Sequence, residues 1–231
     1  MMNKNIFIAF DTTDVKKINN IIKQTQTKKI KLSYKFGLEF FYSKNGREFI
    51  SKIKHKNEIF LDLKLADIPN TCASAINALK DLRNVKYITA HVVGGFDMLV
   101  SIKKAAKKIN KEIKILGVTV LTSFSKSSLK KVGHTRSIKD LVIRQAKLAR
   151  LSGLDGIVCS ANEVKYIKKI CKNMEIVTPG IRLPGDSSND QKRIASPKFA
   201  FNNGATSIVI GRSLTQGSVK NNLKRLIKSL D

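Results

Sequence analysis

A short run of charged residues near the end of the first third of the chain is the first feature with the pattern of a reactive site. Asp62 and Lys64 lie in a strongly apolar segment on either side of Leu63, and Asp67 follows shortly after. Residues two apart on a β-strand share a face, so Leu63 should point outward while its two charged neighbours point inward together. Buried charges are costly unless they are paired. Lys35, on the preceding predicted strand, can reach Asp62 and complete an alternating Lys–Asp–Lys array, which Asp67 extends if its loop or a second subunit brings it close.

This array suits chemistry in which CO2 leaves a carbon atom and a proton takes its place. A lysine held beside carboxylates stays protonated, so it is a poor nucleophile but a good general acid. Next to a carbon that becomes a carbanion, the ammonium group stabilises the negative charge and then supplies the proton. A carboxylate close to a substrate carboxylate would also raise the ground-state energy of that group. The alternative is a purely structural ion-pair network. We favour a functional site, because charged groups that gather at strand ends are usually functional.

A second group of residues has the chemistry of a phosphate site. Gly211 and Arg212 follow an apolar strand-like run and open a helix-like segment, and Arg182 follows the preceding strand-like run. Backbone N–H groups at a helix start bind phosphate well when an arginine accompanies them. Simple helix–strand packing would also explain the glycine, but position and chemistry together favour phosphate.

The elements that must position these residues alternate regularly along the chain. Apolar, β-branched runs predict buried parallel strands, and segments of helical periodicity lie between them. The predicted strands are Ile6–Phe10, Ile30–Phe36, Ile59–Leu65, Tyr87–Val93, Ile113–Leu121, Gly156–Cys159, Ile176–Thr178 and Thr206–Ile210. The predicted helices are Asp14–Gln26, Thr71–Leu82, Met98–Ile109, Lys139–Leu151, Asn162–Cys171 and Leu214–Leu230.

This alternation predicts an α/β protein in which residues 1–231 form a single (β/α)8 TIM barrel, a fold of about 250 residues. An open doubly wound sheet is the alternative. That fold would have a glycine-rich phosphate turn after the first strand, where this sequence has Phe10-Asp11-Thr12-Thr13.

In a barrel, polar residues at the C-terminal ends of strands face the active site. The residues in such positions are Asp11, Lys35, Asp62, Lys64, His91, Thr122, Arg182 and Arg212. The polar segment Leu183–Asp190, after the seventh strand, is typical of an active-site lid.

The amino-acid composition argues against a nucleic-acid-binding protein and a membrane protein. The net charge of +27 invites a nucleic-acid reading, but the lysines are spread over nearly every predicted helix and the chain has no tryptophan. Dispersed charge of this kind indicates solvated helix faces. There is no apolar stretch of about 20 residues and no secretory signal. The three widely spaced cysteines fit buried thiols in a reducing compartment. We therefore expect a cytoplasmic protein with no membrane and no specific nucleic-acid partner.

The segment Phe60-Leu61-Asp62-Leu63-Lys64-Leu65-Ala66-Asp67-Ile68-Pro69-Asn70-Thr71 resembles the signature of the orotidine 5′-phosphate decarboxylase family. The resemblance covers essentially the whole chain. It continues at Asp11 and in Tyr34-Lys35-Phe36-Gly37, Leu121-Thr122-Ser123, Thr178-Pro179-Gly180-Ile181-Arg182, Asp190-Gln191-Lys192-Arg193 and Ile210-Gly211-Arg212. It implies decarboxylation of orotidine 5′-phosphate to uridine 5′-phosphate in de novo pyrimidine biosynthesis, without a metal ion or an organic cofactor.

The resemblance also implies roles for individual residues. Lys64 would donate the proton to C6 of the pyrimidine, with Asp62 near the departing carboxylate and Lys35 beside it. Asp67 and Thr71 would reach into the active site of a partner subunit, which implies a homodimer. The residues implied to bind substrate are Asp11 and Lys35 at the ribose, Thr122 (or Ser123) at the pyrimidine, and Gln191, Gly211 and Arg212 at the phosphate, with Arg182 on the lid.

Departures from the family pattern are few. Leu65-Ala66 replaces the commoner Phe-His, Ser213-Leu214 replaces Pro-Ile, and Phe10 stands where leucine is usual. None of these positions has a charged role. The nearest rival is a sister decarboxylase or aldolase of sugar phosphates that uses a divalent metal, although Lys35 and His91 are poor neighbours for a hard cation. A rival of another class, an RNA-binding protein on a barrel that has lost its activity, would lack a catalytic residue, and none is missing.

Overall fold

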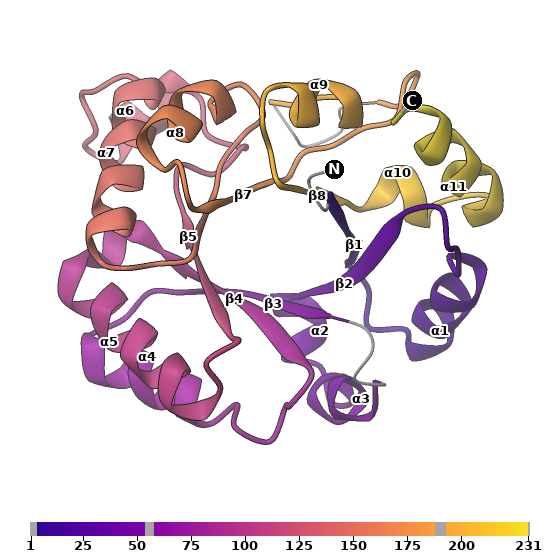
Figure 1. Cartoon of the computed structure of the whole chain (residues 1–231), viewed down its shortest axis with the longest axis horizontal. Coiled ribbons are helices and arrows are strands. Elements are labelled where there is room, and N and C mark those ends of the chain that lie inside the picture. The colour runs from indigo at the N-terminus through magenta and orange to yellow at the C-terminus, as the bar shows by residue number, and fades with distance from the viewer. Residues whose placement is uncertain (1–3, 54–57, 188–192, 231) are drawn as a thin grey trace.

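The chain folds into a closed barrel of parallel strands surrounded by helices (Figure 1). The computed structural model describes residues 4–53, 58–187 and 193–230. The strands pair in the order β1-β2-β3-β4-β5-β6-β7-β8, and β8 closes onto β1. Their bounds are β1 Asn5–Phe10, β2 Lys31–Gly37, β3 Ile59–Leu65, β4 Val85–His91, β5 Lys114–Val118, β6 Gly156–Val158, β7 Glu175–Thr178 and β8 Ser207–Ile210. The predicted TIM-barrel fold is confirmed.

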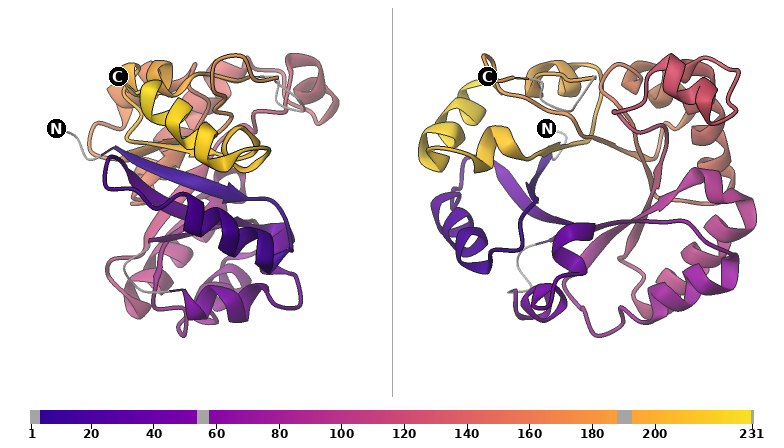
Figure 2. Two further views of the ribbon diagram at one scale, coloured as in Figure 1. Left: turned by 90° about the vertical axis from the view of Figure 1, so that its right-hand side faces the viewer. Right: turned by 180° about the vertical axis from the view of Figure 1, so that it is seen from behind.

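The helices lie outside the barrel, as the side and rear views of Figure 2 show. They are α1 Val15–Gln24, α2 Leu38–Phe41, α3 Gly46–Lys52, α4 Pro69–Asn77, α5 Gly95–Ile109, α6 Lys126–Lys131, α7 Ile138–Leu151, α8 Val164–Ile170, α9 Pro197–Asn202, α10 Arg212–Thr215 and α11 Val219–Lys228. Local capping explains several starts. Asp14 caps α1 by accepting a hydrogen bond from the Lys17 N–H, and Ser137 caps α7 through the Asp140 N–H.

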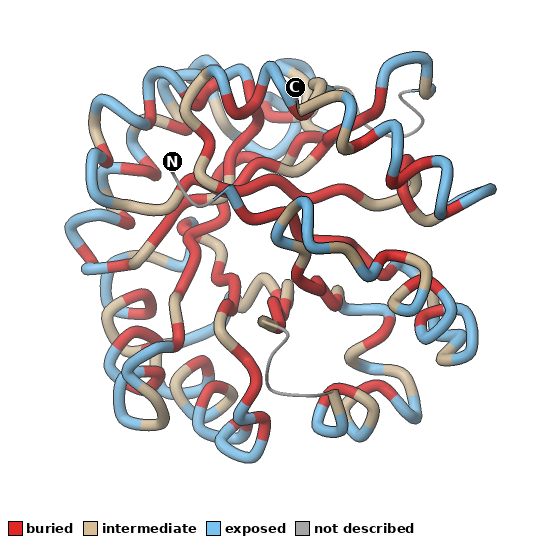
Figure 3. The backbone as a smooth tube through the Cα atoms, turned by 45° about the vertical axis from the view of Figure 1, so that its right-hand side comes forward, coloured by how far each residue is buried: buried red, intermediate tan, exposed pale blue. Residues whose placement is uncertain are grey.

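The strands are buried on both faces, which is why they read as continuous apolar runs (Figure 3). A large outer cluster fills the space between strands and helices, with Ile18 and Ile21 of α1 as typical members. A small inner cluster fills the barrel itself. It contains Phe7, Ala9, Phe60, Tyr87, Leu116, Val177 and Val209. The ring of Phe7 meets those of Phe60 and Tyr87 edge to face, with centroids 5.1 Å apart in both pairs. The inner cluster forms a solid floor below the C-terminal mouth.

Several predicted boundaries are wrong where an apolar run continues past a strand. β4 ends at His91 rather than Val93, because a 3-10 turn at Val92–Gly94 follows and Gly95 takes φ 87°. β5 ends at Val118, although Val120 remains buried in the loop beyond it. In these loops apolar residues are buried without belonging to the sheet, which periodicity does not distinguish.

The helix predictions missed short elements and one break. α2, α3, α6 and α9 were not predicted, although α6 begins at a capping box of Ser125 and Ser128, and α9 begins at the Ser196 cap followed by Pro197. The single helix predicted at Leu214–Leu230 is two helices, α10 and α11. They are separated at Gly217, whose φ of 68° stops the first helix. Within the described segments, none of the helices has the length and apolar composition that a bilayer crossing requires.

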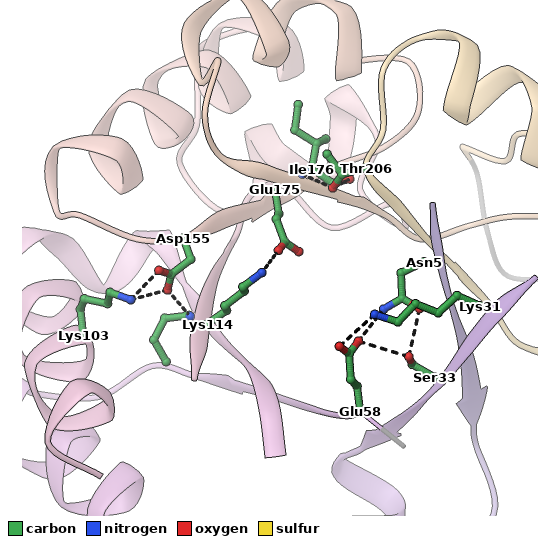
Figure 4. Close-up of polar contacts among 11 residues, drawn as sticks. Asn5, Lys31, Ser33, Glu58, Lys103, Lys114, Asp155, Glu175, Ile176 and Thr206 are labelled. Carbon is green, nitrogen blue, oxygen red and sulfur yellow. Dashed lines mark hydrogen bonds and ion pairs between the residues drawn. The ribbon is translucent and has the colours of Figure 1, made fainter. Parts of the chain in front are cut away.

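The N-terminal rim of the barrel carries a set of paired polar groups (Figure 4). Glu58 accepts hydrogen bonds from Asn5 at 3.0 Å and Lys31 at 2.9 Å, and Lys114 pairs with Glu175. Asp155 accepts the Lys103 ammonium at 2.5 Å and the Ile115 N–H at 2.7 Å. In TIM barrels this face serves stability rather than catalysis. Lys103 is 7% exposed, so the ion pair with Asp155 offsets the cost of burying its ammonium group.

We therefore expect Asp155→Ala to lower the free energy of unfolding by about 3 kcal/mol or more, because it leaves a buried ammonium unpaired. The double variant Lys103→Met/Asp155→Ala should recover part of that loss, because the uncompensated charge is gone. Urea denaturation of the two variants and the unmodified protein measures this. A double variant no more stable than Asp155→Ala would contradict this account.

Candidate active site

A cavity of about 320 Å³ opens at the C-terminal ends of the barrel strands. Its floor is apolar and includes Phe60 and Val209 of the inner cluster. Its walls carry the polar side chains that the sequence placed at strand ends, except His91, which does not line the cavity. The cavity is lined by Asp11, Lys35, Asp62, Lys64, Thr122, Ser123, Arg182, Gly211 and Arg212, together with apolar and small residues. The structure thus brings most of the predicted site residues together in one place.

The centre of the charged wall is Asp62. Its Oδ2 atom accepts the Lys64 Nζ at 2.8 Å and the Lys35 Nζ at 3.2 Å. The Asp62 side chain is 15% exposed and that of Lys35 is 10% exposed. Burial alone would raise the pKa of Asp62, but the two ammonium groups outweigh it and lower this pKa to about 2. The carboxylate is therefore ionised at physiological pH, in the Lys–Asp–Lys arrangement that the sequence predicted.

A bulge in β3 presents Asp62 and Lys64 to the cavity. Leu61 pairs with Ile88 of β4 and Leu65 pairs with Ala90, so three residues of β3 stand opposite the single residue Thr89. Lys64, within this bulge, has φ 50°, the one positive φ among the non-glycine residues that the structure describes. A left-handed conformation costs a residue with a Cβ roughly 1–2 kcal/mol. Leu63 points outward into the core, as predicted, but regular alternation alone does not produce the geometry of Lys64.

Thr89 holds the bulge from the neighbouring strand, and sequence reasoning missed it. Its hydroxyl donates a hydrogen bond to Asp62 Oδ1 at 3.0 Å and accepts one from the Lys64 N–H at 2.9 Å. The only signal in the sequence is that Thr89 is a polar residue between two apolar ones, Ile88 and Ala90. His91 itself has a lowered pKa because it is partly buried and lies near the Lys64 ammonium, with Asp62 opposing the shift. Its imidazole is neutral at physiological pH.

The opposite wall carries the predicted phosphate residues. Arg182 is 7% exposed, and its guanidinium donates to the carbonyl groups of Ser187 at 3.1 Å and Ile181 at 3.0 Å. Gly211 precedes α10, so it opens this short helix rather than the last helix of the chain. A Cβ atom at Gly211 would lie 3.4 Å from Asp11 Oδ2, which shows how closely the first and last strands bring these residues together.

Two predicted residues, Asp67 and Thr71, do not line this cavity. Of the two possibilities that the sequence left open for Asp67, its own loop or a second subunit, the loop does not bring it into the array within one chain. Its side chain is exposed, and its Oδ1 accepts the Ile68 N–H at 2.6 Å, because the turn into α4 carries it away. Thr71, in the first turn of α4, is also exposed. Gln191 lies outside the described residues, as does the end of the predicted lid.

A second buried ion pair braces the loops around the cavity and was not predicted. Arg193 pairs with Glu163, at the start of α8, and donates to the carbonyl groups of Val120 and Leu121 at 3.0 Å each. Burial raises the pKa of Glu163, although Arg193 opposes the shift. This contact fixes the main chain just before Thr122. Arg193 belongs to one of the segments that resemble the family, but the sequence did not indicate which residues it contacts.

The pKa of Asp62 makes a prediction about stability. Because this pKa is lowered from 3.8, ionised Asp62 stabilises the fold fully above about pH 4, and that contribution is lost as pH falls toward 2. We expect the difference in unfolding free energy between the unmodified protein and Asp62→Asn to shrink by about 1 kcal/mol from about pH 6 to about pH 3. Urea denaturation at both pH values measures it. A Lys35→Met background should reduce the change, and a difference independent of pH would contradict the assignment.

Comparisons with known proteins agree with this geometry. A family model described as "Orotidine 5'-phosphate decarboxylase / HUMPS family" matches residues 4–224. A relative named orotidine 5′-phosphate decarboxylase from Wolbachia sp. subsp. Brugia malayi is 43% identical over 229 residues, covering 97% of this chain and 98% of the relative. A relative of the same name from Fusobacterium nucleatum is 39% identical over 232 residues, covering 99% and 96%.

A solved structure gives the same result. The crystal structure of orotidine 5′-phosphate decarboxylase from Lactobacillus acidophilus superposes with a TM-score of 0.84 and 32% sequence identity, covering 99% of both chains. The resemblance inferred from the sequence is therefore confirmed over nearly the full length of the chain. The protein belongs to the orotidine 5′-phosphate decarboxylase / HUMPS family.

Proposed function

We propose that this protein converts orotidine 5′-phosphate to uridine 5′-phosphate and CO2 in pyrimidine biosynthesis, without a metal ion or an organic cofactor. The observation that carries the proposal is the Lys35–Asp62–Lys64 array, which opens into the same cavity as Arg182, Gly211 and Arg212. One end of the cavity therefore offers a proton donor beside a carboxylate, and the other offers groups that bind phosphate. Family membership supports this substrate.

In the proposed step, the bond between C6 of the pyrimidine and its carboxylate carbon breaks, and CO2 departs. The electron pair stays on C6, where the Lys64 ammonium stabilises it and then transfers a proton from Nζ to that carbon. Solvent reprotonates the lysine. Asp62 remains ionised, since its pKa is about 2, and it destabilises a substrate carboxylate placed next to it. Lys35 helps to hold Asp62 in place.

Other lining residues, together with Gln191 from outside the described residues, bind the rest of the substrate in this proposal. Asp11 and Lys35 contact the ribose hydroxyls, and Thr122 or Ser123 contacts the pyrimidine. Gln191, Gly211, Arg212 and Arg182 bind the phosphate. Binding energy from this remote group would be expressed at the reacting carbon. We also propose that residues 1–231 form one catalytic domain and that the enzyme acts in the cytoplasm, where its three buried free cysteines would stay reduced.

We further propose a homodimer in which Asp67 and Thr71 complete the partner's site. Both side chains are exposed, and neither lines the cavity of its own chain. Large apolar side chains on the segments that follow the neighbouring strands β2, β3 and β4 are exposed as well, with Tyr42 76%, Ile68 65% and Val93 63% exposed. Exposed apolar residues of this size, when they lie together, indicate a protein interface. A two-fold interface here would exchange the same residues between both subunits.

The direct test follows the loss of orotidine 5′-phosphate absorbance in excess EDTA, for the unmodified protein and for Lys64→Ala. We expect turnover to survive the chelator and to fall by at least about 1,000-fold in the variant, because the proton donor is gone. Turnover that requires Mg²⁺, or activity on sugar phosphates instead, would favour a metal-dependent sister enzyme. A folded dimer without turnover would refute the proposal.

The shared site predicts complementation between two inactive variants. Lys64→Ala and Asp67→Asn proteins, unfolded together and refolded as a mixture, should recover about a quarter of the unmodified activity. Half of the dimers are then mixed, and each mixed dimer has one intact site of two. A mixture of Lys64→Ala with Asp62→Asn is the matched control and should recover nothing, because both residues belong to the same site. No recovery in the first mixture would place Asp67 outside the partner's site.

A further inference from the structure

One buried hydroxyl links the backbone of Lys64 to the side chain of Asp62. Thr89, at the middle of β4, is 0% exposed, so its side chain cannot touch a ligand in the cavity. Its Oγ1 atom accepts the Lys64 N–H at 2.9 Å and donates to Asp62 Oδ1 at 3.0 Å. The hydroxyl therefore uses its single proton and a lone pair on two neighbours that both belong to the charged array.

The position of Thr89 explains why a hydroxyl is needed there. Three residues of β3, 62–64, stand opposite this one residue of β4, so the regular ladder of backbone hydrogen bonds is interrupted. The N–H of Lys64 would otherwise be a partly buried donor without a strand partner. The Thr89 side chain takes the place of the missing backbone carbonyl and holds Lys64 at φ 50°.

The same hydroxyl also orients the carboxylate. Asp62 Oδ2 accepts both lysines, at 2.8 and 3.2 Å, in an orientation that leaves Oδ1 to Thr89. The Thr89 bond to Oδ1 fixes that orientation from the opposite side. Loss of the hydroxyl leaves Oδ1 without this donor and frees the carboxylate to rotate away from the lysines.

We propose that Thr89 is a positioning residue for proton transfer: through the strand bulge it sets where the Lys64 ammonium and the Asp62 carboxylate lie relative to the substrate. This inference rests on the proposed function of the same site. Valine has nearly the shape of threonine but lacks the hydroxyl, and serine keeps the hydroxyl but lacks the methyl group. Thr89→Val and Thr89→Ser therefore separate the hydrogen bonds from the packing.

We expect Thr89→Val to lower kcat about 10- to 100-fold, since a displacement of about 1 Å at reacting groups costs up to about 100-fold in rate. KM and the dissociation constant for uridine 5′-phosphate should change less than about 3-fold, because the Thr89 hydrogen bonds go to Lys64 and Asp62 and not directly to the residues proposed to bind phosphate and ribose. Thr89→Ser should keep kcat within about 3-fold of the unmodified protein. Thermal unfolding of each variant gives the folded fraction to which kcat is normalised.

An unchanged normalised kcat in Thr89→Val would overturn the proposal, as would an equal loss in both variants, which would point to packing. Absence of turnover in the unmodified protein would instead refute the proposed function, so it is measured first. A readout independent of activity is hydrogen exchange at the Lys64 backbone amide. It should accelerate at least about 10-fold in Thr89→Val and not in Thr89→Ser, and unchanged exchange in Thr89→Val would also overturn the proposal.

Discussion

The ionised carboxylate of Asp62, buried at the mouth of the barrel, is the constraint on which the site depends. A charge in this position is tolerated only if it is paired and hydrogen-bonded. Its Oδ2 atom accepts two ammonium groups and its Oδ1 accepts the Thr89 hydroxyl, so each oxygen has a donor. These contacts require Lys35 on one neighbouring strand, Thr89 on the other, and a bulge between them. The irregularity of β3 is thus a consequence of satisfying one buried charge.

The residues that stabilise the fold and those proposed to act on substrate lie at opposite ends of the barrel axis. The N-terminal rim pairs its charges in ways that support only the fold, such as Lys103 with Asp155. The inner cluster around Phe7 and Phe60 then closes the barrel to water. Above it, the C-terminal mouth gathers charged groups whose contacts leave space for a ligand. The strain at Lys64 lies in this upper layer, where backbone irregularity is associated with function.

The fold and the membership of the cavity could be predicted from the sequence because they follow from local patterns. The apolar strand runs and the polar residues at their ends placed Asp62, Lys64 and Arg212 around one mouth. Contacts that depend on register could not be predicted in this way. Thr89 matters only because β3 gains residues relative to β4, and the partners of Arg193 lie on segments distant in the sequence. The location of Asp67 depends on the turn into α4, and its proposed role depends on a second chain.

A crystal structure of the protein with uridine 5′-phosphate tests the central claim most directly. The account predicts that C6 of the pyrimidine lies within about 3.5 Å of Lys64 Nζ, a near-attack distance, and that the phosphate contacts Gly211 and Arg212. It also predicts that Lys64 keeps its positive φ, with Thr89 still bound to both partners. A nucleotide whose C6 faces away from Lys64, or whose phosphate is bound elsewhere, would contradict the account.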